Sequence, residues 1–185
     1  MNKRVSRIVL SLILGSIGVA AGLYFGRFLA GGAGLPFATS YVALVITTGA
    51  VWWACVGLTG GAALAAGAVR SHRLRFLLIS IASFALGGVV AALPEAARAD
   101  RASTLALLAI PLGGALAGLG IGLAAGIKAR AVITMTAGAL AMFIARPYFA
   151  LIPPSDPIAL LAPGALIGAV LAALVMNSSD TSQTA

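Results

Sequence analysis

Residues 104–127 read TLALLAIPLGGALAGLGIGLAAGI, and this stretch decides the fold class. It has no charged residue and exceeds the length of about 20 apolar residues that a helix needs to cross a bilayer. Glycine recurs at every fourth position, at Gly114, Gly118, Gly122 and Gly126. Residues four apart lie on one side of a helix, so these glycines form a stripe without side chains. Because such stripes let membrane helices approach closely, we predict a transmembrane helix that packs tightly against a neighbour.

The rest of the chain has the same apolar character. Its 185 residues are 61% hydrophobic and 9% charged, whereas soluble domains carry about 25% charged residues. We predict an all-α, polytopic transmembrane helical bundle that forms one domain over residues 1–176, with a polar cytoplasmic tail over residues 177–185. Six spans are predicted, and the fifth has the shortest apolar part. The spans cover about residues 8–31, 41–69, 76–93, 104–127, 131–152 and 157–176.

The basic residues predict how the spans are oriented. Lys and Arg accumulate in the cytoplasmic loops of membrane proteins. With six spans, eight of the 12 basic residues fall on the side of the N-terminus, so we expect both ends in the cytoplasm and a bacterial-type cytoplasmic (inner) membrane. In short gaps between apolar runs these residues would meet lipid headgroups, not nucleic acid. The eight are Lys3, Arg4, Arg7, Arg70, Arg73, Arg75, Lys128 and Arg130, and the other four are Arg27, Arg98, Arg101 and Arg146.

The start of the chain has two interpretations. Lys3, Arg4 and Arg7 followed by an apolar run are typical of a signal peptide, and residues 19–21 read VAA, where a peptidase could cut. The apolar run continues to Gly31, which is longer than a typical signal core. We therefore favour a first span that is retained.

Glycine stripes also occur in three other predicted spans. Their four-residue steps place each set on one side of a helix. We expect these glycines to mediate close helix packing, either within one chain or between copies or other membrane subunits. The alternative is that a stripe without side chains lines a path for a solute. The glycines are Gly18, Gly22 and Gly26 in the first span, Gly57 and Gly61 in the second, and Gly164 and Gly168 in the sixth.

The predicted spans contain few groups that could carry chemistry. All four acidic residues lie in predicted loops or in the tail, which removes the usual proton relays and cation sites of membrane proteins. One histidine, His72, and one cysteine, Cys55, cannot build a metal site without acidic partners. No set of nucleophile, base and orienting group is visible. We therefore expect no enzyme activity, no metal and no cofactor.

Arg27 and Arg146 each lie at the outer end of a predicted span, beside aromatic residues. Such arginines usually extend to the headgroups within an aromatic belt. The alternative is that both guanidinium groups converge on an anion or on Asp156. The pattern as a whole favours a non-catalytic, Gly-rich packing or complex-forming subunit whose partners are lipid and further copies or other membrane subunits. The alternative function is a transporter or channel for a small solute or an ion, in particular an anion.

Overall fold

The computed structural model describes residues 3–32, 40–67, 72–99, 104–124, 128–151 and 161–179. In these residues the chain forms six helices and no strand, which confirms the predicted all-α class. Each helix corresponds to one predicted apolar run. The helices are α1 (Lys3–Gly32), α2 (Tyr41–Gly67), α3 (Arg73–Ala96), α4 (Thr104–Ala124), α5 (Lys128–Leu151) and α6 (Leu161–Ser179).

Several helices extend beyond the apolar runs that predicted them. α1 begins at Lys3, α3 at Arg73 and α5 at Lys128, so basic residues form the first turn of each. Backbone hydrogen bonding does not depend on hydropathy, so a helix continues into its charged flank when nothing breaks it. α3 also passes through Pro94, beyond the predicted end of its span at residue 93. This proline has no N–H to donate to the carbonyl four residues earlier, so the helix loses one hydrogen bond there and ends two residues later, at Ala96.

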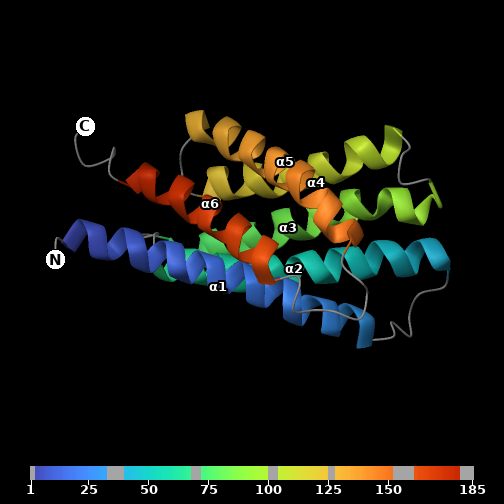
Figure 1. The fold of residues 1–185 in the computed structure, drawn as a ribbon, viewed down its shortest axis with the longest axis horizontal. Coiled ribbons are helices and arrows are strands. Elements are labelled where there is room, and N and C mark those ends of the chain that lie inside the picture. The colour runs from blue at the N-terminus through green and yellow to red at the C-terminus, as the bar shows by residue number, and fades with distance from the viewer. Residues whose placement is uncertain are drawn as a thin grey trace.

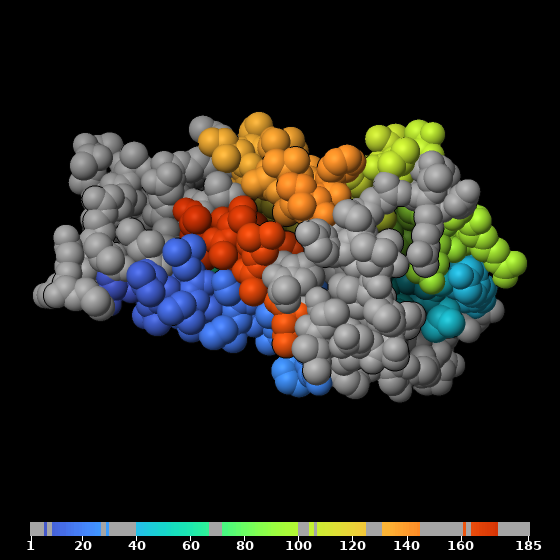
Figure 2. All heavy atoms as spheres, in the orientation of Figure 1, coloured from blue at the N-terminus to red at the C-terminus, as the bar shows by residue number. Residues whose placement is uncertain are grey.

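The six helices are arranged as a ring in which sequence neighbours are also spatial neighbours. α2 packs between α1 and α3, and α4 packs between α3 and α5. α6 returns to α1 and makes far less contact with α5, the helix that precedes it. Figure 1 shows α6 crossing the face of the bundle between α1 and α5, and Figure 2 shows the same order on the surface.

Neighbouring helices in this ring run antiparallel. Gly18 of α1 faces Gly60 of α2, whereas Gly26, further along α1, faces the earlier Trp52. The same reversal holds for the other extensively packed pairs. As a result, α1, α3 and α5 begin at the end of the bundle where α2, α4 and α6 finish (Figure 1).

A cluster of buried apolar residues lies between the helices of the ring. Its most buried large members are Leu23 of α1, Leu64 of α2, Phe76 of α3 and Ile121 of α4, each no more than 1% exposed. Leu171 of α6 joins the same cluster. The outer faces of all six helices carry exposed large apolar side chains. The molecule is therefore apolar both inside and outside, which is the pattern of a chain whose surroundings are lipid.

Four of the described helices are long and apolar enough to cross a membrane. They contain the stretches Val9–Gly26, Tyr41–Ala66, Arg73–Ala96 and Leu107–Ala124. α5 and α6 contain shorter apolar stretches, Ala131–Ile144 and Gly164–Ala173. The length and hydropathy of the first four helices indicate a membrane protein.

The ends of α2 and α3 are capped at the side of the bundle opposite the N-terminus. Ser40 precedes α2, and its Oγ accepts a hydrogen bond from the backbone N–H of Ala43 at 3.2 Å. At the end of α3, the N–H of Ala99 donates to the Pro94 carbonyl at 2.8 Å, and the N–H of Arg98 donates to the Glu95 carbonyl at 3.0 Å. These two bonds form a Schellman motif. Its left-handed position is occupied by Arg98, with φ 52°, where glycine is usual.

Candidate functional site

The predicted packing glycines of α1 lie along its contact with α2. A Cβ atom added to Gly18 would lie 2.8 Å from the Thr59 carbonyl oxygen, and one added to Gly26 would lie 2.8 Å from the Trp52 carbonyl oxygen. Gly22, between them, would place a Cβ 2.5 Å from the Cα of Val56. Real Cβ atoms do not approach other heavy atoms this closely, so a methyl group at any of the three would push α1 and α2 apart.

The predicted glycines of α2 face α3. A Cβ on Gly57 would lie 2.7 Å from the Ser80 carbonyl oxygen, and a Cβ on Gly61 would lie 2.8 Å from the Ser80 Cβ. Both glycines therefore approach the same turn of α3. Ser80 is itself small and fully buried, so the two helices meet through residues with almost no side chain on either side.

The four-residue glycine stripe of α4 lies against α5. A Cβ on Gly118 would overlap the Thr134 carbonyl oxygen and lie 2.8 Å from its carbonyl carbon. Gly114 meets Gly138 and Met142, and Gly122 meets Ala131. The fourth member, Gly126, lies outside the described residues. Because the obstacle at Gly118 is backbone, a substituted side chain there cannot be accommodated by a rotamer change.

The predicted glycines of α6 bring that helix to α1. A Cβ on Gly164 would lie 2.8 Å from the Cα of Ala20, and a Cβ on Gly168 would lie 2.5 Å from the carbonyl carbon of Gly15. Gly15 is not part of a four-residue stripe of glycines, so the sequence pattern did not predict its role. Together the two helices meet backbone to backbone at Gly15 and Gly168.

Pairs of glycines from facing helices meet at every extensively packed contact of the ring. The sequence pattern predicted three of these ten residues, Gly18, Gly114 and Gly168, because the other seven stand outside a regular four-residue pattern of glycines. A glycine outside a stripe gives no sequence signal of its own. Its packing role appears only in its contact with the facing helix. The pairs are Gly15 with Gly168, Gly18 with Gly60, Gly49 with Gly88, Gly87 with Gly113 and Gly114 with Gly138.

Adjacent glycines provide a signal that could have identified the central helices. Consecutive residues of a helix are about 100° apart, so a Gly-Gly doublet opens two different faces. Gly87 faces α4 and Gly88 faces α2, while Gly113 faces α3 and Gly114 faces α5. In α2, Gly60 faces α1 and Gly61 faces α3. The doublets thus mark α2, α3 and α4 as helices that pack between two others.

The two adjacent tryptophans of α2 also face two different neighbouring helices. The indole N–H of Trp52 donates a hydrogen bond to the Leu23 carbonyl of α1 at 3.0 Å. The absence of a side chain on Gly26 allows this approach, since its Cβ would lie 2.6 Å from the Trp52 ring. Trp53 faces α3 instead, where its ring stacks on Phe84 with centroids 6.2 Å apart. Both side chains therefore hold α2 to its neighbours.

Most hydroxyl groups inside the described part of the bundle are satisfied by their own helix. The Ser80 Oγ donates to the Phe76 carbonyl at 2.9 Å, and the Thr134 Oγ1 donates to the Ala131 carbonyl at 3.1 Å. Among the described residues, the Ser11 Oγ is buried without a hydrogen-bond partner. The described residues contain no group of three His, Cys, Asp or Glu side chains that could hold a metal ion.

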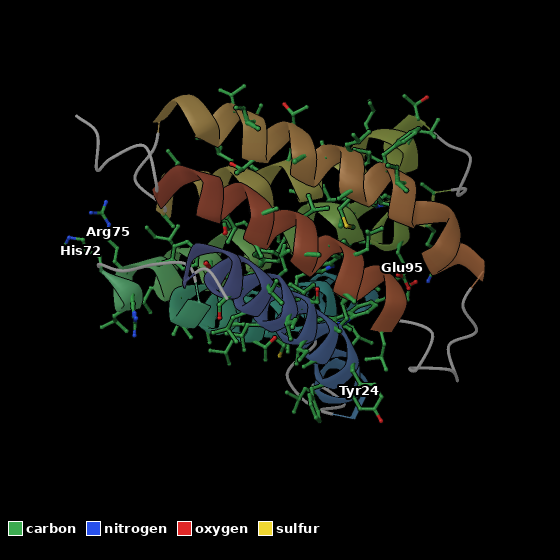
Figure 3. All side chains as sticks on the ribbon, turned by 60° about the vertical axis from the view of Figure 1, so that its left-hand side comes forward. Tyr24, His72, Arg75 and Glu95 are labelled. Atoms are coloured by element: carbon green, nitrogen blue, oxygen red, sulfur yellow. The ribbon has the colours of Figure 1, made fainter. Side chains whose placement is uncertain are left out.

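Arg27 and Arg146 lie near the ends of α1 and α5, at the same end of the bundle. Their side chains are outside the described residues. The two helices are not neighbours, because α6 lies between them in the ring. Glu95 is exposed at this end, near the finish of α3, whereas His72 and Arg75 extend from the opposite end (Figure 3).

Comparisons of the chain with known protein families, with curated proteins and with solved structures give no match.

Proposed function

We propose that this chain is a non-catalytic integral membrane protein of a bacterial-type cytoplasmic membrane, a tightly packed helical subunit that crosses the bilayer six times. The observation that carries the proposal is the set of glycine pairs that join the packed helices backbone to backbone. Such contacts are how helices associate where lipid removes the hydrophobic effect between them. A soluble bundle would need a polar exterior, which these helices lack.

The dimensions of α5 and α6 support counting them as spans. At about 1.5 Å per residue, their 24 and 19 residues correspond to lengths of about 36 Å and about 28 Å. The hydrocarbon core of a bilayer is about 30 Å thick. Both helices also run antiparallel to a neighbour that is itself long and apolar enough to span. Packing in one ring with four candidate spans supports counting α5 and α6 as the fifth and sixth spans.

The basic residues support an orientation with both termini in the cytoplasm. α1, α3 and α5 all begin with Lys or Arg, and they begin at the same end of the bundle. The opposite end carries Arg98 and Glu95 among its described residues. Lys and Arg near span ends favour the cytoplasmic side.

The apolar cluster between the helices supports a packing role over permeation. Leu23, Phe76 and Ile121 come from three different helices and meet in one apolar cluster. Each of the glycines with a described contact faces another helix of the same chain. A partner subunit would therefore dock on the outer faces, through side chains such as Leu78 and Leu86, not through a free glycine stripe.

Topology is tested by cysteine labelling. In a Cys55→Ala background, single cysteines replace Ser71 or Ala129 on the proposed cytoplasmic side and Ala97 on the other side. A membrane-impermeant maleimide added to intact cells is expected to label only the cysteine at position 97, and permeabilised cells are expected to label all three. Labelling at positions 71 and 129 in intact cells would overturn the orientation, and labelling of 71 but not 129 would overturn the count of spans.

The packing role is tested against permeation in liposomes. Full-length protein reconstituted at known density is expected to give anion flux at the level of empty liposomes, and native co-purification is expected to retain further membrane subunits. A flux above background that Arg146→Ala abolishes would replace the packing proposal with the anion-transport alternative.

A further inference from the structure

We propose that reciprocal Cα–H···O=C hydrogen bonds between glycines join α2, α3, α4 and α5 at one level of the bundle and hold them as one unit. In three contacts between these helices, a Cβ built on either glycine would meet the carbonyl oxygen of the other. The inference deepens the proposed packing role and rests on it. The three pairs, called here the glycine girdle, are Gly49 with Gly88, Gly87 with Gly113, and Gly114 with Gly138.

Each girdle glycine carries a hydrogen where other residues carry Cβ. That hydrogen lies toward the facing carbonyl oxygen, and the facing glycine repeats the contact in return. For Gly87 and Gly113 the distance from the built Cβ to the facing oxygen is 2.5 Å in both directions. A carbonyl oxygen has two lone pairs, and the N–H of its own helix uses one of them. The second lone pair accepts the Cα–H, a contact that recurs between closely packed helices.

Two glycine doublets place the three pairs at one level. Gly87 faces α4 while Gly88 faces α2, and Gly113 faces α3 while Gly114 faces α5. Consecutive residues of a helix rise by about 1.5 Å, so the three pairs lie within about 3 Å of one another along the helix axes. Within each doublet, the peptide unit connects the contact on one side of its helix to the contact on the other. The girdle therefore runs without interruption from α2 to α5.

The girdle divides the bundle into parts that are held differently. The atoms nearest to each girdle glycine belong to α2, α3, α4 or α5. α6 instead meets α1, through the reciprocal pair of Gly15 and Gly168. If α6 moves away from α5, the girdle keeps α5 in place against α4. It is a conformational device that keeps four helices together while the sixth changes its contact.

The Hα chemical shifts of the glycines test the girdle directly. The full chain is studied in lipid bilayers by proton-detected solid-state NMR, which resolves the two Hα signals of each glycine. A hydrogen that donates to a carbonyl oxygen loses electron density and moves downfield. We therefore expect the two Hα signals of each girdle glycine to be well separated. The glycines measured are Gly49, Gly87, Gly113, Gly114 and Gly138.

Two other helical glycines serve as controls within the same spectrum. Gly60 and Gly164 are equally buried, but the atoms nearest to their built Cβ positions are carbon and nitrogen, not oxygen. Their two Hα signals should lie closer together than those of the girdle glycines. Gly88 is left out of the comparison because the Trp53 ring lies beside it and shifts its signals independently.

One substitution breaks a single pair of the girdle. Gly138→Ala removes the hydrogen that faces Gly114, so the two Hα signals of Gly114 should move together. The signals of Gly49, at the other end of the girdle, should stay separated and thereby show that the bundle is folded. Gly164→Ala, at the contact of α6 with α1, is the matched control and should leave the signals of both Gly114 and Gly49 unchanged.

Equal Hα separation in the girdle and control glycines of the unsubstituted protein would overturn the inference. An unchanged Gly114 after Gly138→Ala, in a bundle that keeps the Gly49 separation, would also overturn it. Poorly dispersed amide signals throughout the unsubstituted protein would instead contradict the tightly packed fold on which the proposed function rests.

Discussion

The glycines act at the scale of single residues, because each leaves out a Cβ that the facing helix would block. Gly61 and Ala62 of α2 offer a matched comparison, since Gly61 is buried against Ser80 and the adjacent Ala62 is exposed. We expect Gly61→Leu to lower the free energy of unfolding by roughly 1–3 kcal/mol through overpacking. Ala62→Leu should change it by less than about 0.5 kcal/mol. Unfolding in mixed micelles with increasing denaturing detergent measures both, and equal losses would show that the α2–α3 contact is not as close as described.

Trp52 contributes a single hydrogen bond between helices. Trp52→Phe removes the indole N–H that reaches the Leu23 carbonyl and keeps an aromatic ring. We expect a loss of about 0.5–1.5 kcal/mol in the free energy of unfolding. Trp53→Phe is the control, because a phenyl ring at that position can still stack on Phe84. If Trp53→Phe were the more damaging of the two in the same detergent titration, the hydrogen bond would not be the main role of Trp52.

At the scale of helices, a side-chain contact joins the residues that follow α3 to the start of α2. The guanidinium carbon of Arg98 lies 5.0 Å from the centroid of the Tyr41 ring, in the geometry of a cation–π interaction. Arg98 also holds a left-handed conformation that glycine would adopt without strain. Its side chain thus gains a contact while its backbone is strained, and the two effects can be separated.

A double-mutant cycle separates the side-chain contact of Arg98 from its backbone strain. Tyr41→Leu should lower the free energy of unfolding more in the unsubstituted protein than in an Arg98→Gly background, with a coupling of about 0.5–1 kcal/mol. Arg98→Gly alone should be nearly neutral, because relief of the backbone conformation offsets the lost contact. A coupling of zero would mean that the ring and the guanidinium do not interact in the membrane-embedded protein.

At the scale of the whole molecule, the sequence predicts the class of structure far better than the neighbours of each helix. The apolar runs that led to 76–93 and 104–127 became α3 and α4, because a long apolar segment in lipid has no alternative to a helix. The placement of α6 beside α1 could not be predicted. Its glycines show that it has a close partner, but Ala, Gly and Leu dominate every span and give each one a similar surface.

The contact between α5 and α6, which closes the ring, is therefore the least constrained helix contact of the bundle. α6 meets α1 through the Gly15–Gly168 pair, and α5 meets α4 through the Gly114–Gly138 pair, whereas glycine contacts between α5 and α6 are absent from the described residues. Regions with few packed contacts open at lower free energy than well-packed ones. We expect α5 and α6 to move apart more readily than either moves from its other neighbour.

Spin-label distances measure this difference directly. In a Cys55→Ala background, one pair of labels joins the exposed positions Ile17 of α1 and Leu166 of α6, and a second joins Leu140 of α5 and Leu166. All three side chains face outward, so the labels should not disturb the interior. Pulsed electron paramagnetic resonance in nanodiscs should give a narrow distribution for the first pair and a broader or bimodal one for the second. Equal widths would show that α5 and α6 are held together as firmly as the other neighbouring helices. In that case lipid, and not glycine contact, holds α6 beside α5.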